Sequence, residues 1–265
     1  MMHKSLWLLL CVGLLAPARA QHRTNELRLS AGITQALMRD EQASPLRYHA
    51  GVKTVRLGYF HRSNRARFGL ELAPGVGTLL PDRFGARTYG DEAYSYTVSS
   101  AYYRLDLGVH YLRRLGKADG RSLRLFVGGS LRENFRYADA IANFNWGTNL
   151  LGLRAEGLVE WTPGTRHRFT VRAGLPVLAA VTRHTYANFP KSTDDANLPA
   201  FFRQGTRLGT VNRLQQLVLE AGYQWQVGKR FSLGGTYGFD GFRYALPRTI
   251  RAADQSFALQ TGFHF

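Results

Sequence analysis

Two histidine-containing segments are the first candidates for acid–base chemistry in this chain. Asp106 and His110 lie four residues apart in a stretch where polar and apolar residues alternate. Four residues along a β-strand span about 13 Å, so we expect this pair to join a polar cluster rather than to share a proton. His61-Arg62-Ser63 falls in a short predicted turn. No His or Cys cluster has the spacing of a metal site, so we expect no catalytic residues, no metal and no cofactor.

A larger set of charged residues alternates with leucine and valine along most of the chain. Arg28, for example, lies between Leu27 and Leu29, and this period of two is typical of a strand with one apolar and one polar face. In a narrow barrel, near-balanced charges on the polar faces should pair across the interior rather than line a wide channel. The predicted lumen network has six arginines and five acids: Arg28, Arg56, Glu71, Arg104, Asp106, Arg124, Arg154, Glu156, Glu160, Arg172 and Glu220.

The elements that must hold these charges are strands. No stretch sustains a helical period of 3.6, and the content of 28 Gly, 13 Tyr and 16 Phe suits pleated strands. A count of eight or twelve is also open, because 81–94 and 183–209 are long enough to contain strand extensions. We expect ten strands, at 25–37, 47–60, 67–80, 95–113, 122–137, 147–162, 167–182, 210–227, 231–245 and 254–265.

Composition limits the class of protein. With 45% hydrophobic residues the chain is not disordered, and its length allows one large all-β domain. The single cysteine excludes a disulfide framework. Beyond residue 20 no apolar run approaches the ~20 residues of a membrane helix, so a helical membrane protein is excluded.

The first twenty residues have the features of a secretory signal peptide. A short basic start precedes an apolar stretch at 6–16, and Ala18 and Ala20 form a small-x-small cleavage site. Cleavage after Ala20 removes two basic residues and lowers the formal net charge from +17 to +15. We therefore predict a signal peptide at 1–20 and a single domain at 21–265.

Two features favour a transmembrane barrel over a soluble sandwich, which would also alternate. One is unequal connections: 61–66, 114–121, 163–166 and 228–230 are short, whereas 38–46, 81–94, 138–146, 183–209 and 246–253 are longer. The other is aromatic residues at both strand ends, which predict two girdles around an apolar band. Beside the short turns these are Tyr59, Phe68, Tyr111, Trp161, Phe169, Trp225, Phe231 and Phe265; beside the long loops they are Tyr48, Tyr96, Tyr102, Phe135, Trp146, Phe239, Tyr244 and Phe257.

The C-terminal segment carries a resemblance to a known class. Phe257, Leu259, Phe263 and Phe265 occupy alternate positions, and the chain ends on phenylalanine. This segment resembles the terminal strand signal of bacterial outer-membrane β-barrel proteins of the Gram-negative type. The resemblance implies a transmembrane antiparallel up-and-down β-barrel in the cell outer membrane. It also implies a partner, the barrel assembly machinery that reads this strand.

Two enzyme families also belong to this class of barrel, so their site motifs can be compared with this sequence. The omptin proteases are ten-stranded, and their site is similar to paired Asp residues plus an Asp-x-His on opposite walls. This chain has no Asp-x-Asp and no Asp-x-His, and Asp194-Asp195 are adjacent in a loop. Lipid A deacylases carry His-x-Ser near the outer rim, whereas the one match beyond the predicted signal peptide, from His61 to Ser63, lies in a turn on the opposite side. Neither activity is predicted.

The excess of basic residues predicts contact with outer-membrane lipids, including lipopolysaccharide. Nucleic acid is not expected, because the signal peptide directs the chain to another compartment. The turns hold Arg62, Arg65, Arg113, Arg114, Lys117, Arg121, Arg166, Lys229 and Arg230. The outer loops hold Arg83, Arg87, Arg183, Lys191, Arg203, Arg207, Arg248 and Arg251.

The function expected from these observations is that of a small monomeric outer-membrane barrel with a charge-plugged lumen. Its role would be structural or accessory, and it would not be an enzyme. A small-solute diffusion pore is the main alternative, in which the inward charges would form a constriction. The third candidate is an envelope enzyme acting on lipid or peptide, and the fourth is a soluble secreted β protein.

Overall fold

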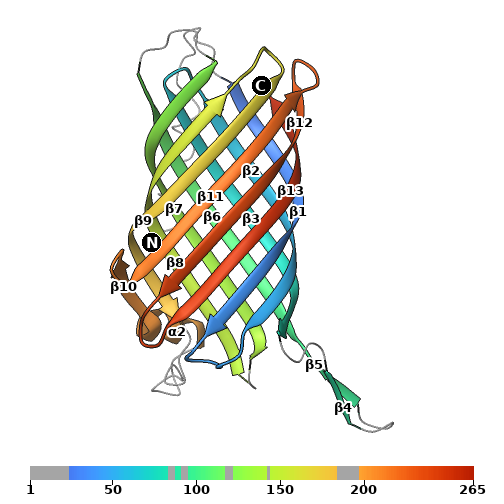
Figure 1. The fold of residues 1–265 in the computed structure, drawn as a ribbon, viewed down its shortest axis with the longest axis vertical. Helices are drawn as coiled ribbons and strands as arrows, with labels where there is room; N and C mark the ends of the chain where they lie inside the picture. Colours follow the sequence, from blue (N-terminus) through green and yellow to red (C-terminus); the bar gives the residue numbers. More distant parts are fainter. Residues whose placement is uncertain (1–23, 83–86, 91–94, 117–121, 142–143, 184–196) are drawn as a thin grey trace, which may run out of the picture.

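The computed structural model describes residues 24–82, 87–90, 95–116, 122–141, 144–183 and 197–265. Its main feature is a closed antiparallel barrel of ten strands (Figure 1). Each strand pairs with the next along the chain, and the last pairs with the first, which closes the sheet. The barrel strands are β1 (Thr24–Asp40), β2 (Tyr48–Arg62), β3 (Ala66–Pro81), β6 (Ser100–Leu115), β7 (Leu123–Ile141), β8 (Phe144–Trp161), β9 (His167–Arg183), β11 (Leu214–Gln226), β12 (Phe231–Tyr244) and β13 (Ile250–His264).

The two ends of the barrel differ. At one end, here called the turn end, β1 begins, β13 ends and short connections join the strands; Gly164 in one of these turns has a φ of 70°, which favours glycine. The opposite end, the loop end, carries the additional elements, which lie at the bottom of Figure 1. These are the hairpin of β4 (Arg87–Gly90) and β5 (Ser95–Val98), the helix α2 (Asn197–Gly205) and the short strand β10 (Thr206–Thr210).

The outer surface of the barrel is an apolar belt. Alternate residues of every barrel strand point outward, and many are leucine or valine; Leu29 is 51% exposed and Leu259 65% exposed. Water would penalise so much exposed hydrocarbon, whereas a lipid bilayer accepts it. Closure has the same cause, because in hydrocarbon every backbone N–H and C=O must be paired within the protein. In the described ranges, no helix is long and apolar enough to span a membrane.

The predicted strands are confirmed in number and order, and three boundaries are corrected. Residues 95–113 are not one strand, because β5 pairs with β4 in a separate hairpin and β6 starts at Ser100. The predicted loop 138–146 is mostly strand, since β7 runs to Ile141 and β8 starts at Phe144. Residues 206–210 and 214–226 are two strands that both pair with β9.

The predicted aromatic girdle at the loop end is wrong in part. Tyr48, Tyr102, Trp146 and Tyr244 point into the barrel and are at most 8% exposed. At this end the lumen is filled by apolar side chains, so apolar residues occupy both faces of the strands and alternation no longer separates inside from outside. Tyr96 lies among residues whose side chains the structure does not describe.

A register shift in β9 corrects two further positions. Ala179 and Val181 belong to the apolar alternation of this strand and would face outward by its period, yet both are 1% exposed inside the barrel. Leu153 pairs with Leu178, whereas Arg154 pairs with Pro176, so one residue of β9 bulges out of the ladder. Proline has no N–H to give to the ladder, which explains a bulge at this position, and the bulge reverses the orientation of every later residue.

Candidate functional site: the filled lumen

The lumen is filled in layers, and the layer nearest the loop end is apolar. Leu79, Leu150, Leu214 and Ile250 meet here and are at most 3% exposed. In the same part of the lumen, where Asp40 pairs with Ile250, the Asp40 carboxylate accepts hydrogen bonds from Arg183 at 2.5 Å and from the Trp146 indole at 2.9 Å. The loop end of the barrel therefore contains packed hydrocarbon and one buried ion pair.

Next to the apolar layer, on the side toward the turn end, lies an ion cluster here called the outer ion cluster. It consists of Arg104, Asp106, Arg136, Arg154 and Asp254. Asp254 accepts from Arg104 and from Arg136, each at 2.7 Å. Arg104 also binds Asp106 at 2.5 Å. Arg154 is 2% exposed and donates to the side chain of Asn134, which in turn donates to Asp106.

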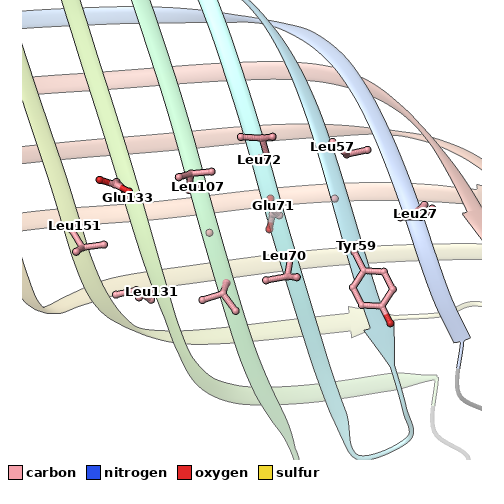
Figure 2. Close-up of a pocket in the computed structure, with 13 residues that line it drawn as sticks. Leu27, Leu57, Tyr59, Leu70, Glu71, Leu72, Leu107, Leu131, Glu133 and Leu151 are labelled. Carbon is pink, nitrogen blue, oxygen red and sulfur yellow. The ribbon is translucent and has the colours of Figure 1, made fainter. Parts of the chain in front are cut away.

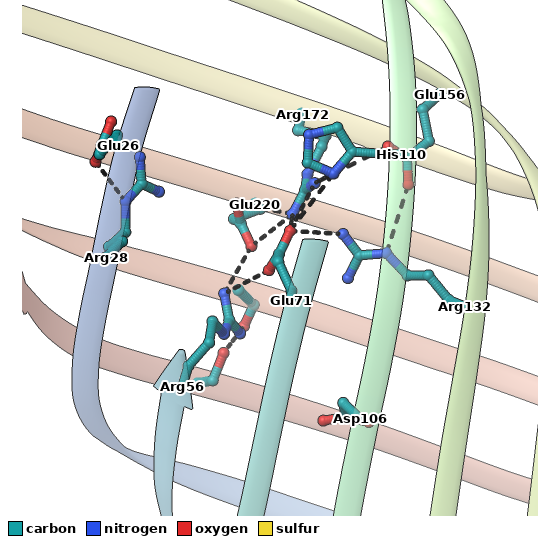
Figure 3. Close-up of polar contacts among 12 residues, drawn as sticks. Glu26, Arg28, Arg56, Glu71, Asp106, His110, Arg132, Glu156, Arg172 and Glu220 are labelled. Atoms are coloured by element: carbon teal, nitrogen blue, oxygen red, sulfur yellow. Dashed lines mark hydrogen bonds and ion pairs between the residues drawn. The ribbon is translucent and has the colours of Figure 1, made fainter. Parts of the chain in front are cut away.

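The central ion cluster consists of Arg56, Glu71, His110, Arg132, Glu156, Arg172 and Glu220 (Figure 3). Glu71 is its hub, because its carboxylate lies 3.2 Å from Arg172, 3.4 Å from Arg132 and 3.6 Å from Arg56. Arg172 also donates to Glu220 at 3.1 Å. Three arginines and three glutamates thus neutralise one another in the middle of the barrel.

Glu156 and His110 complete the central ion cluster. Glu156 accepts a hydrogen bond from Ser130 at 2.6 Å and lies 3.6 Å from Arg132. Arg172 donates to His110 Nδ1 at 3.2 Å, which requires that nitrogen to be unprotonated. His110 is therefore a member of a packed polar network, and Asp106, in the outer ion cluster, is not its partner.

The turn end holds the third group, the inner ion cluster of Glu26, Arg28, Arg62, Arg67, Arg124 and Glu160. Glu26 is fully buried and lies 2.8 Å from Arg62 and 2.9 Å from Arg28. Arg67 binds Glu160 at 2.8 Å, and Arg124 lies 3.4 Å from the same carboxylate. The turn end is therefore also occupied by paired charges.

Several of these contacts cross the barrel instead of joining neighbouring strands. In the closed order of strands, β7 and β13 are five apart in either direction, so the Arg136–Asp254 pair joins opposite walls. Asp40 on β1 and Trp146 on β8 are likewise on opposite walls. Both of these contacts lie in the half of the barrel nearer the loop end.

The structure places all eleven residues of the predicted network inside the barrel, in the three ion clusters. Sequence reasoning missed other inward charges, and all of them except Arg183 are at equivalent positions of the same alternation. They include Asp40, Glu26, Arg62, Arg67, Arg132, Arg136, Arg183 and Asp254. Two of them correct the surface charges expected from the sequence: Arg62 and Arg183 point into the lumen and not to lipid headgroups. The strand period could have identified Arg62 and Arg132, whereas Arg183 required knowledge of the bulge in β9.

The remaining candidates for chemistry have structural surroundings. His61 Nδ1 donates a hydrogen bond of 2.8 Å to Asn25 Oδ1, and the Ser63 hydroxyl accepts one from the backbone N–H of Ala66 within the turn. No group of three or more His, Cys, Asp or Glu side chains in the described part of the chain is arranged to hold a metal. Ala18 and Ala20 lie outside the described residues, as do Asp194-Asp195.

A hollow of about 460 Å³ lies on the outer face of the barrel (Figure 2). It is lined mainly by outward leucines of six neighbouring strands, among them Leu57, Leu72, Leu107 and Leu151. Glu133 lies at its margin. Most of this lining faces hydrocarbon, which suits acyl chains, and Glu71 of the central ion cluster also belongs to it.

The C-terminal strand has the geometry that its sequence predicts. Phe257, Leu259, Phe263 and Phe265 all point outward, and Phe265 exchanges backbone hydrogen bonds with Asn25 at 3.0 Å. β13 therefore pairs with β1 over its length and forms the closing seam of the barrel.

Several solved structures of bacterial outer-membrane proteins align with this chain over most of its length. The outer membrane protease OmpT from Escherichia coli aligns with a TM-score of 0.50 and 6% identity, over 95% of this chain and 99% of that chain. Neisserial surface protein A aligns with a TM-score of 0.38 and 9% identity, over 90% and 97%. Ail from Yersinia pestis aligns with a TM-score of 0.30 and 11% identity, over 91% and 99%. No family model and no curated protein sequence matches the chain. With its closed ten-strand sheet and apolar outer belt, the chain has the fold of the bacterial outer-membrane β-barrel proteins.

Proposed function

We propose that this chain is an exported, monomeric resident of the outer membrane whose lumen is closed and whose role is structural or accessory. The observation that carries the proposal is the stack of three ion clusters inside the barrel, one of which joins opposite walls through Arg136 and Asp254. A solute would have to separate pairs such as Arg136–Asp254 and Glu71–Arg172, and each separation would leave buried charges without partners. The apolar layer at the loop end adds a barrier that water does not readily enter.

The proposal includes the absence of a catalytic centre. OmpT, with a similar fold, is a protease, but the pairs of Asp and the Asp-x-His expected for that family do not occur in this sequence. His110, the histidine of the central ion cluster, is 6% exposed and in contact with Arg172 and Glu71. A substrate could reach its ring only by displacing that packing.

A liposome-swelling assay tests whether the barrel admits small solutes. Purified protein would be reconstituted into liposomes loaded with an impermeant polymer and diluted into isotonic monosaccharide or amino acid. We expect swelling at the rate of protein-free liposomes. A rate that rises with the amount of protein and falls with solute size would contradict the closed barrel and establish the alternative, a small-solute pore with the ion clusters as its constriction.

A further inference from the structure

We propose that the outward face of β12, β13 and β1 at the loop end binds the phosphorylated sugar headgroup of an outer-leaflet glycolipid, which is the chemistry of lipopolysaccharide. The inference rests on the proposed outer-membrane location, and it names the lipid class and the residues that would recognise it.

Three arginines form a row across these strands. Arg243 pairs with Arg251, and Arg251 pairs with Arg39, in the registers of the two strand pairs. Their neighbours along the chain, such as Ala252 and Met38, are buried in the lumen, so the three guanidinium groups are on the outer face. Directly opposed residues of antiparallel strands lie about 4.5–5.5 Å apart, and like charges at that spacing repel one another.

The protein neutralises this row only slightly. Arg39 has an ion pair with Glu41 at 3.9 Å, and 40% of its side chain is exposed. Among the described residues, Arg243 and Arg251 have no ion pair, and the buried Nε of Arg39 has no hydrogen-bond partner. A phosphate brings charge and several acceptor oxygens, so it would satisfy these donors and relieve the repulsion.

On the side of the arginines that faces the middle of the membrane, the same three strands present uncharged polar groups. Gln255 pairs with Gln35 on β1 and with Phe239 on β12, and both glutamines are exposed. Their amides can donate to and accept from sugar hydroxyls. The Phe239 ring covers Gly241: a Cβ added to Gly241 would lie 2.9 Å from the ring. The ring therefore forms a flat surface beside the Arg243–Arg251 pair, on the side toward the middle of the membrane.

Farther toward the turn end the surface is apolar. Ile33 and Phe257 are each 59% exposed, and Leu259 is 65% exposed. The order along the barrel is thus guanidinium, a short row of Leu37, Ala253 and Gly241, then amide and aromatic, then hydrocarbon. This order matches the phosphate, the sugar and the acyl chains of a phosphorylated glycolipid, and the amide layer favours a sugar headgroup over a glycerophospholipid.

The test compares two double variants that lose the same charge. Arg243→Gln/Arg251→Gln removes two members of the row, and Arg113→Gln/Arg230→Gln removes two exposed arginines at the turn end. The dissociation constant for lipopolysaccharide would be measured in nonionic detergent at fixed salt. We expect the first variant to bind about 30-fold more weakly, which corresponds to ~1 kcal/mol for each arginine, and the second to bind like the unmodified protein. If the glutamine variant fails to refold, Arg243→Lys/Arg251→Lys replaces it in the binding measurement. This variant keeps both charges and should retain most of the affinity for lipopolysaccharide.

Three outcomes would overturn the inference. The first is equal weakening in both double variants, which would indicate bulk charge attraction. The second is undiminished binding of lipopolysaccharide from which phosphatase has removed the phosphates. The third is equally tight binding of phosphatidylglycerol, which would show that the sugar contributes nothing. Membrane fractionation separates this inference from the proposed location: outer-membrane protein that fails to bind contradicts only the inference, whereas binding by protein absent from that fraction contradicts only the location.

Discussion

Replacement of Glu71 by glutamine is the sharpest test of the central ion cluster. The substitution keeps the shape of the side chain and removes one negative charge from contact with Arg172, Arg132 and Arg56. Two glutamates would then remain for three arginines in the middle of the barrel. Because the arginines are held by separate strands, they cannot all move to other partners.

The expected cost follows from that count. Removing one partner of a buried ion pair costs about 3–5 kcal/mol, since the other charge stays buried without compensation. Glutamine can still accept one hydrogen bond, and Glu220 can still bind Arg172 and Arg56. We therefore expect Glu71→Gln to lower the free energy of unfolding by about 3 kcal/mol.

The assay is reversible denaturant unfolding in lipid vesicles, followed by tryptophan fluorescence. Glu133→Gln is the matched control, because it makes the same chemical change on the outer face, where Glu133 accepts a hydrogen bond from Asn149 at 2.9 Å. The control should lower the free energy of unfolding by less than about 1 kcal/mol. Equal losses for the two variants would refute the reasoning, because the cost would then come from the amide itself and not from the lumen.

Three other substitutions test separate parts of the account. Leu219→Arg should lower the free energy of unfolding by about 2–4 kcal/mol in the same assay, because Leu219 lies within the apolar belt. Leu115→Arg, at the turn end, should lower it by only about 0–1 kcal/mol. Similar losses for the two variants would mean that the belt is misplaced. Phe265→Glu should reduce the amount of protein in outer-membrane fractions, by disturbing the strand that resembles an assembly signal; unchanged abundance would remove that role. Arg172→Glu should destabilise more than Arg172→Met, because it places a third acid beside Glu71 and Glu220, and the opposite order would contradict the described contacts.

The sequence was sufficient to predict the barrel because one physical constraint acts on every strand. A residue that faces lipid must be apolar, and the next one faces the interior, so alternation identifies both the strands and their inward residues. Leu29 and Arg28 illustrate this: one is exposed on the outer belt and the other lies in the inner ion cluster. The number of strands followed from the same pattern.

Alternation fails where its physical cause is absent. At the loop end the interior is as apolar as the exterior, so Trp146 and Tyr244 carry no sign of which face they occupy. The bulge at Pro176 reverses the faces of β9, which no period can predict. Which charges pair across the lumen depends on the stagger between distant strands, so the Arg136–Asp254 bridge could not be derived from spacing.

The central claim is that paired charges close the lumen, and single-channel recording in a planar bilayer tests it most directly. The unmodified protein should give no steady channel, and Glu156→Ala or Glu220→Ala should raise the current because a shorter side chain removes a bridge from the central ion cluster. Large, steady conductance in the unmodified protein that neither substitution changes would contradict the account, and the inward acids would not close the barrel.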